Sequence, residues 1–485
     1  MKILLTPFFL LFLFIVNAQN EIDLYRYSKT TYQGSARFEA MGGSFGALGA
    51  DLSSAQINPA GYGRYSSSQI GGSVFGGVVN NTSIFNANSS NRSEGFGGLG
   101  NAAIVITQDV SDDNNGFQFL QVGLGYNRIE SYRNSFKYSG QQYYSLLDDY
   151  VDQAYGYYSD ELSTYFPFST DLAYQTGALT YNSSGPFYQS KLNSGDVIHD
   201  RNVNATGGVN EFFLSVSANY VNRLYIGANI GVRTFNYEEE IQHSERLTDY
   251  TGTDFRGFDY NYSLKTTGTG LNLKIGAIYL ITPSIRLGLA VHTPTFTDLK
   301  DEYSADMISY FETYSSSVLP SKIPSGVNKY GIRNPTKIIG SLGFVFGMRG
   351  SLNVDVEYLN YQNAYLTATS DESYPSYDYK YENDAAEKLF QRAINLRIGG
   401  EIVVLTSFYV RAGYGYYGNA FKTGSELNPD QLLSGGVGYK RGNYNFDIAF
   451  KRQYSNYNYF SFSRGVTEMD ATRNSITLSA TYKFN

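Results

Sequence analysis

The segment from Leu352 to Glu357 alternates between apolar and polar side chains with a strict period of two. In an extended strand, Leu352, Val354 and Val356 fall on one face, while Asp355 and Glu357 fall on the opposite face. The core of a soluble β-sandwich rarely tolerates two carboxylates on an inward face. A transmembrane barrel accepts this pattern, because one face of its wall meets lipid and the other meets a hydrated lumen.

The same alternation recurs along the chain. Between these segments, short polar turns alternate with long tyrosine-rich connections. This sorting of short and long connections is typical of outer-membrane barrels, which also have an even number of strands. The sequence therefore predicts an all-β fold, a transmembrane antiparallel β-barrel of about fourteen strands. The expected strands are 67–80, 97–109, 117–128, 211–221, 224–233, 270–281, 285–292, 337–347, 351–361, 394–402, 408–417, 431–439, 444–453 and 474–484.

The amino-acid composition argues against several other classes of protein. Charged residues make up 17% of the chain, below the usual quarter, while 46 tyrosines and 50 glycines are in excess. Such a bias also occurs in disordered low-complexity chains, but those lack a regular alternation. A net charge of -7 without a basic stripe argues against nucleic-acid binding. The absence of cysteine excludes disulfides and thiolate metal sites.

The first residues predict export. Lys2 precedes an apolar run over residues 3–16, and Val16-Asn17-Ala18 offers small residues at the cleavage positions. The run is shorter than the roughly 20 residues that a spanning helix needs. Residues 1–18 are therefore predicted to be a signal peptide, and the exported barrel is expected in the bacterial outer membrane as a multi-pass protein.

Residues 19–66 lie between this signal and the barrel, residues 67–485, and lack the alternation of a strand. Short helices are expected around residues 36–41 and 44–48. The segment has two natural places, the periplasm or the lumen, and a barrel of fourteen strands has room for a plug. TonB-dependent uptake is disfavoured, because its plug domain needs many more residues than this segment supplies.

The run ARFEAMGGSFGALGAD at residues 36–51, followed by Asn58-Pro59-Ala60-Gly61, resembles the N-terminal hatch of the long-chain fatty-acid and aromatic-hydrocarbon transporters of the FadL/TodX type, in the version common in Bacteroidota. The resemblance implies a hatch inside the lumen and extracellular loops that catch the substrate. It also implies a pocket near the hatch and a sideways exit through the wall. The substrate-binding and gating residues that it implies are Phe38, Met41, Gly42, Gly43, Phe45, Leu48, Asp51, Asn58, Pro59 and Ala60.

The residue types in the hatch suit this role. Asn58 can cap the turn that Pro59 fixes, and Gly61 relieves crowding beside the first strand. Gly42 and Gly43 permit backbone conformations that other residues resist, so the hatch could rearrange. The alternative is that these residues only build a tight, static plug.

Charged side chains of both signs are expected on the lumen face of the wall. One reading is a hydrated salt-bridge network that holds the wall and anchors the hatch; the other is that a cation meets a substrate carboxylate. The residues concerned are Lys274, Arg286, Asp355, Glu357, Arg397, Glu401, Arg411, Asp447 and Lys451.

Other candidate sites are weaker. His199 and His243 are expected to be exposed in outer loops, and His292 at the outer end of a strand. Without a supporting motif, neither a lipase nor a metal site is predicted, and no cofactor is expected. Residues 111–116 resemble a calcium loop but lack its final glutamate, so a turn is favoured.

Two long connections, 129–210 and 293–336, are expected to be outer loops that fold locally. Apolar residues at 143, 146, 147, 150 and 151 fit a helical stripe, which either gathers greasy substrates or packs onto a neighbouring loop. Glu238–Glu240 and Asp301–Glu302 are expected to be solvated loop charges, with divalent-ion binding among lipopolysaccharide phosphates as the alternative.

Taken together, these features predict passive uptake of hydrophobic small molecules, long-chain fatty acids or aromatic hydrocarbons, by a plugged barrel that is not an enzyme. The alternative is a barrel component of a protein secretion or surface-attachment system that binds a partner protein. The expected partners are the substrate, outer-membrane lipid and lipopolysaccharide, with no nucleic acid, and the barrel is expected to be a monomer.

Overall fold

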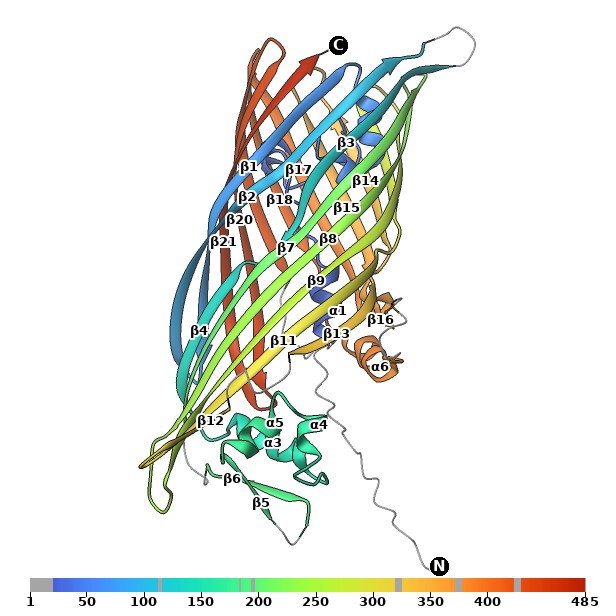
Figure 1. Cartoon of the computed structure of the whole chain (residues 1–485). Helices are drawn as coiled ribbons and strands as arrows, with labels where there is room; N and C mark the ends of the chain where they lie inside the picture. Colours follow the sequence, from blue (N-terminus) through green and yellow to red (C-terminus); the bar gives the residue numbers. More distant parts are fainter. Residues whose placement is uncertain are drawn as a thin grey trace, which may run out of the picture.

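The chain forms a closed antiparallel barrel in a computed structural model that describes residues 21–111, 116–182, 185–192, 197–318, 325–369, 371, 377–422 and 429–484 (Figure 1). β1 (Ser68–Phe85) pairs with β2 on one side and with the last strand, β21, on the other, which closes the wall. The other strands that build the wall are β2 (Asn88–Asp109), β3 (Phe117–Ser131), β4 (Asn134–Gln142), β7 (Val197–Tyr220), β8 (Leu224–Leu247), β9 (Phe255–Leu280), β10 (Ile285–His292), β11 (Phe296–Phe311), β13 (Gly326–Arg333), β14 (Lys337–Val345), β15 (Gly350–Asn360), β16 (Tyr365–Ala368), β17 (Arg392–Leu405), β18 (Phe408–Tyr417), β19 (Asp430–Arg441), β20 (Tyr444–Phe462) and β21 (Gly465–Phe484).

Four pairs of consecutive strands each share one position in the wall. β3 and β4 both pair with β7, and β10 and β11 both pair with β9. β13 and β14 continue one another opposite β11 and β10, and β15 and β16 continue one another opposite β14 and β13. The wall thus has 14 positions, and each expected strand overlaps one of them, so the predicted strand number is confirmed.

A band of outward apolar residues marks the part of the wall that lies in lipid. On β9, Leu271, Ile275 and Tyr279 are exposed on the outer face, while Lys265 and Ser263 continue the same face with polar side chains. Equivalent changes occur on β7 and β8. These exposed apolar residues, the apolar belt, lie on the strand segments next to the short turns. The C-terminus lies at the same end of the barrel (Figure 1), and short turns mark the periplasmic side in barrels of this type.

The strands continue far beyond the apolar belt. β9 has 26 residues and a length of about 85 Å, against an apolar band of about 25 Å in such barrels. Much of 129–210 and 293–336, predicted as loops, is therefore strand: β4, β11, β13 and β12 (Ser315–Val318). The loop prediction was wrong because strands outside lipid carry polar groups on both faces and lose the contrast on which it depends.

The predicted loop charges lie on these extensions too. Glu238–Glu240 belong to β8, and Glu238 pairs with Lys265 at 3.1 Å. Asp301 on β11 is fully buried and accepts a hydrogen bond from Thr266 at 2.6 Å, so it is not a solvated loop charge. The signal peptide and residues 112–115 of the calcium-like turn lie outside the described residues.

A small lobe, residues 145–192, covers one side of the long-loop end (Figure 1). It contains α3 (Leu146–Ala154), α4 (Leu162–Tyr165), α5 (Thr170–Gln175), β5 (Leu179–Asn182) and β6 (Phe187–Ser190). The predicted stripe falls on α3, where Leu147 is buried in a cluster with Phe258 and Met307 of the strand extensions. The stripe therefore packs onto the barrel, as one of the two alternatives predicted. Another helix, α6 (Lys380–Leu389), lies beside η4 (Tyr361–Asn363) at the same end. Among the described helices, none is long and apolar enough to span a bilayer.

An arginine on the belt is expected to destabilise the barrel. In Ile275→Arg, the guanidinium must enter hydrocarbon, so the free energy of unfolding should fall by about 2–4 kcal/mol in urea titrations from lipid vesicles. Ser263→Arg, on the same face of β9 beyond the belt, is the matched control and should change it by no more than about 0.5 kcal/mol. Equal losses in both variants would show that the belt does not contact lipid.

Candidate functional site

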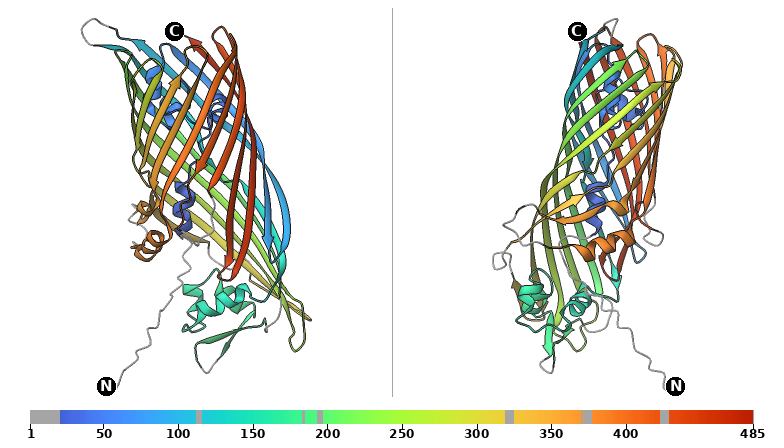
Figure 2. Two further views of the ribbon diagram at one scale, coloured as in Figure 1. Left: turned by 180° about the vertical axis from the view of Figure 1, so that it is seen from behind. Right: turned by 90° about the vertical axis from the view of Figure 1, so that its right-hand side faces the viewer.

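The hatch, residues 21–66, lies inside the barrel and fills it at two levels (Figure 2). α1 (Glu21–Ser28) lies toward the long-loop end, where Leu24 and Tyr27 are buried against the wall. α2 (Ala36–Ala40), η1 (Ser54–Gln56) and η2 (Pro59–Arg64) lie within the belt. The helix expected at 36–41 is present. The helix expected at 44–48 is a single turn, closed by a hydrogen bond from the Gly49 N–H to the Phe45 carbonyl oxygen at 3.2 Å, while the N–H groups of Phe45 and Gly46 donate to Asp355 of the wall.

Glycines on both sides let the hatch backbone touch the wall. Gly42 and Gly43 have φ of +62° and +73°, a conformation that L-residues with side chains rarely adopt. A Cβ at Gly413 of β18 would collide with the Gly42 nitrogen, and one at Gly399 of β17 with the Met41 carbonyl oxygen. Substitution of these glycines would therefore push the hatch turn away from the wall.

Asp355 of β15 anchors the next part of the turn. Its buried carboxylate accepts hydrogen bonds from the backbone N–H groups of Phe45 at 3.0 Å and Gly46 at 3.2 Å. Asn353 donates to the same carboxylate at 2.6 Å, and the Ser44 hydroxyl donates to the Asn353 carbonyl oxygen at 3.0 Å. A carboxylate predicted from the alternation of β15 thus holds the hatch through backbone amides.

Ion pairs of both polarities also join the hatch to the wall. Arg37 of α2 contacts Glu401 at 3.1 Å, and Lys451 of the wall contacts Glu39 of α2 at 2.9 Å. Such charge-assisted bonds are stronger than neutral ones, because both partners are ionised. The hatch is therefore held electrostatically as well as by packing.

All nine predicted lumen charges face inward and have partners in the protein. Five of them touch the hatch: Arg286 donates to the Leu48 carbonyl oxygen, Glu357 accepts from Tyr32, and Asp355, Glu401 and Lys451 bind as described. The other four are paired within the wall, in the contacts Lys274–Glu211, Arg397–Glu357, Arg411–Glu401 and Arg411–Asp447. Eight of the nine thus have a partner of opposite charge, while Arg286 contacts a carbonyl oxygen. This pattern favours the anchoring network over a cation that awaits a substrate carboxylate.

The apolar hatch residues form one cluster behind these polar contacts. Phe38 and Phe45 stack with ring centroids 5.5 Å apart, and Met41 and Leu48 pack around them. Ile339 of β14 completes the cluster from the wall. Aromatic pairs of this kind add stability beyond the area that they bury.

Asn58 joins three parts of the site. Its Oδ1 accepts from the Ala60 N–H at 3.1 Å, so it caps η2 as predicted. Its Nδ2 donates to the carbonyl oxygens of Gly46 at 2.7 Å and of Ala277 on β9 at 3.1 Å. The Ser217 hydroxyl holds the Pro59 carbonyl oxygen at 2.8 Å. Gly61 relieves crowding against Gly49 and Ser54 within the hatch, rather than against the first strand.

Two further predicted residues take buried positions. Asp51 accepts from the Ser35 hydroxyl at 2.9 Å and closes a loop within the hatch. His292, expected to be exposed, is buried, and its Nε2 lies 2.9 Å from the Ile57 carbonyl oxygen of the hatch. The prediction for His292 was wrong because the hatch covers the lumen side of its strand, a contact that no strand pattern reveals.

Other hatch-binding residues escaped the sequence prediction. Lys337 donates to Thr30 at 2.5 Å, Lys29 contacts Asp430 at 2.6 Å, and Tyr32 donates to Glu357 at 3.3 Å. Alternation places Lys337 and Asp430 only at the ends of strands, so it gave no signal that they face the lumen. The tyrosine and lysine of the hatch lie outside the motif that carries the resemblance.

The wall is interrupted between β2 and β3 at the long-loop edge of the apolar belt, where Leu99 of β2 and Tyr126 of β3 are followed by outward polar residues such as Arg128. Their pairing runs from Asp109–Phe119 to Asn101–Asn127 and stops there. Among the described residues, 88–100 of β2 then pair only with β1, and 128–142 of β3 and β4 only with β7. We call this interruption the seam.

Small residues line the seam. The stretch from Gly95 to Gly100 contains four glycines, and Gly98 is exposed although its pairing with inward Phe75 places it on the lumen face. Arg133, which follows β3, contacts Glu94 of β2 at 2.8 Å across the gap. Side chains therefore bridge the seam, where no backbone pairing of β2 with β3 is found among the described residues.

The hatch covers the seam from the lumen. The Ser73 hydroxyl of β1 donates to the Gly34 carbonyl oxygen at 2.7 Å, and the Gln33 N–H donates to the Arg128 carbonyl oxygen of β3 at 3.2 Å. Neighbouring hatch residues thus bond to the wall on both sides of the interruption. A cavity of about 260 Å³ lies farther toward the short-turn end, where Arg37 and Asp447 are among its polar lining residues.

Removal of the Asp355 charge should loosen the hatch turn. In Asp355→Asn, one carboxylate oxygen that accepts from backbone N–H groups is replaced by an NH₂ group, which is a donor. The hydrogen bonds to Phe45 and Gly46 should therefore weaken by about 1–3 kcal/mol. Hydrogen exchange at these two amides should accelerate roughly 5- to 150-fold. Asp470→Asn on the exposed wall is the control and should leave them unchanged. Unaltered exchange in Asp355→Asn would contradict the anchoring role.

No family model and no curated protein matches the sequence. Solved structures do match its fold. The chain is similar to a Pseudomonas aeruginosa FadL homologue, with a TM-score of 0.55 and 14% identity over 94% of this chain and 99% of that one.

The chain is also similar to the P. putida toluene transporter TodX, with a TM-score of 0.54 and 14% identity over 94% of this chain and 99% of that one. A deltaS2 mutant of the TodX monoaromatic hydrocarbon channel gives a TM-score of 0.56 at 12% identity, over 93% and 99% of the two chains. At such identities the similarity establishes architecture. The chain has the hatch-containing, fourteen-stranded outer-membrane barrel fold of FadL and TodX.

Proposed function

We propose that the protein takes up hydrophobic small molecules passively across the bacterial outer membrane, with long-chain fatty acids and aromatic hydrocarbons as the substrate class. The observation that carries this proposal is the seam at the edge of the apolar belt, covered from inside by Gln33 and Gly34 of the hatch. The substrate enters at the long-loop end, reaches the hatch, and leaves sideways through the seam into the bilayer.

A sideways exit suits a greasy substrate physically. Release into periplasmic water would expose apolar surface at a cost of roughly 25 cal/mol per Å². Release through the wall keeps the molecule in an apolar environment throughout. Unpaired backbone groups are costly in contact with lipid, so a break in strand pairing at the edge of the apolar belt has to be compensated by other contacts.

The hatch couples the lumen to the seam. Gln33 and Gly34 precede α2, whose Phe38 belongs to the apolar cluster in the lumen. A substrate that inserts beside Phe38 and Phe45 would displace the adjoining segment and with it the cover of the seam. No energy source is needed, because the substrate moves down its own gradient.

Apolar contacts rather than charge pairing would select the substrate. Eight of the nine predicted lumen charges already have a partner of opposite charge, while α1 presents apolar and aromatic side chains, Leu24 and Tyr27, that pack with Phe235 of the wall. Neutral hydrocarbons therefore suit the site as well as fatty acids do. Toluene is the cargo in the name of one structural relative, which supports this class.

Locking the hatch should block uptake. A Cβ at Gly343 of β14 would lie 3.2 Å from the Ala47 Cβ, close to disulfide spacing, and the chain has no native cysteine. The oxidised Ala47→Cys/Gly343→Cys variant should lose at least about tenfold in uptake of radiolabelled oleate and toluene by cells. Reduction should restore it.

The single variants Ala47→Cys and Gly343→Cys, treated with the same oxidant, are the matched controls and should retain uptake. Full uptake by the locked protein would rule out movement of this part of the hatch. Absence of uptake by the unmodified protein, together with co-purification of one periplasmic or surface protein, would instead support the secretion or surface-attachment alternative.

Filling the seam should have the same effect without touching the hatch contacts. In Gly98→Trp, the indole would fill the space in the seam beside Phe75, so uptake should fall by at least about tenfold. Gly340→Trp, a lipid-facing position on β14 with open space around it, is the control and should leave uptake unchanged. Normal uptake by folded Gly98→Trp protein would place the exit elsewhere.

A further inference from the structure

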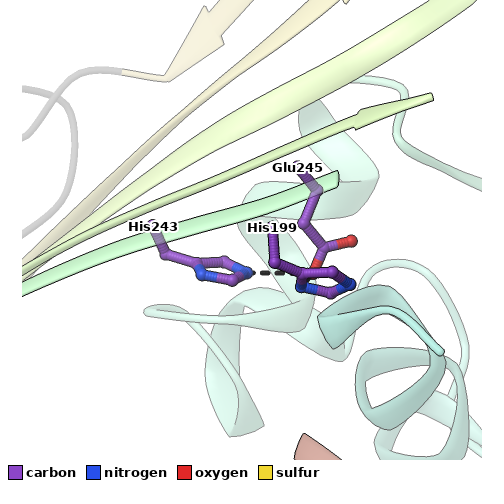
Figure 3. A group of neighbouring side chains, drawn as sticks. All are labelled: His199, His243 and Glu245. Atoms are coloured by element: carbon purple, nitrogen blue, oxygen red, sulfur yellow. Dashed lines mark hydrogen bonds and ion pairs between the residues drawn. The ribbon is translucent and has the colours of Figure 1, made fainter. Parts of the chain in front are cut away.

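Two histidines and a glutamate meet in the strand extensions, outside the apolar belt (Figure 3). His199 lies on β7, directly opposite Glu245 of β8, and His243 lies two residues before Glu245 on the same face of β8. The Glu245 Oε1 is 2.9 Å from the His243 Nε2 and 3.3 Å from the His199 Nδ1. Both histidines were predicted to be exposed in loops, which was wrong because their segments are strands covered by the lobe.

The cluster is buried and incompletely bonded. His199 and Glu245 have no exposed surface, and His243 has 2%. Neither ring nitrogen of His199 has a hydrogen-bond partner among the described residues, and neither has the Nδ1 of His243. Buried polar atoms are normally satisfied, so a fully buried His199 ring without a hydrogen bond, whose Nδ1 lies beside the Glu245 carboxylate, indicates a missing ligand.

We propose that His199, His243 and Glu245 bind one first-row divalent transition-metal ion, with Zn²⁺ as the reference ion. Imidazole nitrogen and carboxylate oxygen are its usual ligands, at about 2.0–2.2 Å. Ligand atoms around a tetrahedral ion then lie about 3.3 Å apart, which is close to both distances to the Glu245 oxygen. Three protein ligands leave a fourth position for water.

The surroundings hold the ligands in place. The His199 ring stacks on Phe462 with centroids 5.5 Å apart, and Phe258 lies 6.0 Å from His243. Arg201 lies opposite His243 on the neighbouring strand and has the same sign of charge as a metal ion. The negative charge of Glu245 is therefore needed to offset the repulsion between Arg201 and the ion.

The metal would tie the lobe to the barrel. Glu245 also accepts hydrogen bonds from the Leu146 N–H at 2.9 Å and from the Ser145 hydroxyl, which caps α3. An ion bound to β7 and β8 would therefore fix the carboxylate on which the first turn of the lobe is built. This role is independent of the proposed transport.

The test uses the full-length protein without a polyhistidine tag, purified in mild detergent and freed of metal with a chelator. Isothermal titration with Zn²⁺ should give one site per chain, and Co²⁺ should give a visible absorption band typical of nitrogen and oxygen ligation. His199→Gln/His243→Gln should lower the affinity by more than the about 10- to 100-fold that loss of an outer-shell partner costs.

His292→Gln removes the remaining histidine and is the matched control, expected to bind Zn²⁺ as the unmodified protein does. Heat-modifiable migration in electrophoresis checks that each variant retains the barrel. Should the double variant fail to fold, His199→Gln alone must abolish the Co²⁺ band. Absence of binding by the unmodified protein, or unchanged binding by folded variants that lack His199, would overturn the proposal.

Discussion

Hydrocarbon offers no hydrogen-bond partner, and this constraint governs the whole molecule. Every strand within lipid must pair its backbone with a neighbour, so the sheet has to close, as β1 and β21 do. It also forces the outward side chains to be apolar while the inward ones stay free to carry charge. The ion pairs that hold the hatch are possible only because the wall separates the lumen from lipid.

At the seam, contacts with the hatch take the place of hydrogen bonds between neighbouring strands. Beyond Asn101 and Asn127 the strands part, and the hatch supplies hydrogen bonds to the wall through Gln33 and Gly34. A plug that completes the wall is more than a stopper, because its displacement opens the lumen toward lipid. The contacts around Asp355 and Asn58 hold the following part of the hatch to the wall in this closed arrangement.

The sequence predicted the barrel well, because alternation within lipid is a local property. The same rhythm on β15 and β17 located Asp355, Glu357 and Arg397 on the inner face. It failed where the environment changes: strands outside the belt resemble loops, and His199 and His243 therefore seemed exposed. The resemblance implied a sideways exit, but the position of the seam could not be predicted. It depends on how far two neighbouring strands stay paired, and the pattern of a single strand does not contain that information.

The most direct measurement of the central claim, that the hatch controls a lateral exit, is a cryo-electron microscopy map of the protein in lipid nanodiscs with excess oleate. The account predicts ligand density beside Phe38 and Phe45, with the backbone at Gln33 and Gly34 drawn away from β1 and β3 and the gap open to lipid. An unmoved hatch with ligand bound in the lumen, or density that passes through the barrel to the periplasmic side, would contradict it.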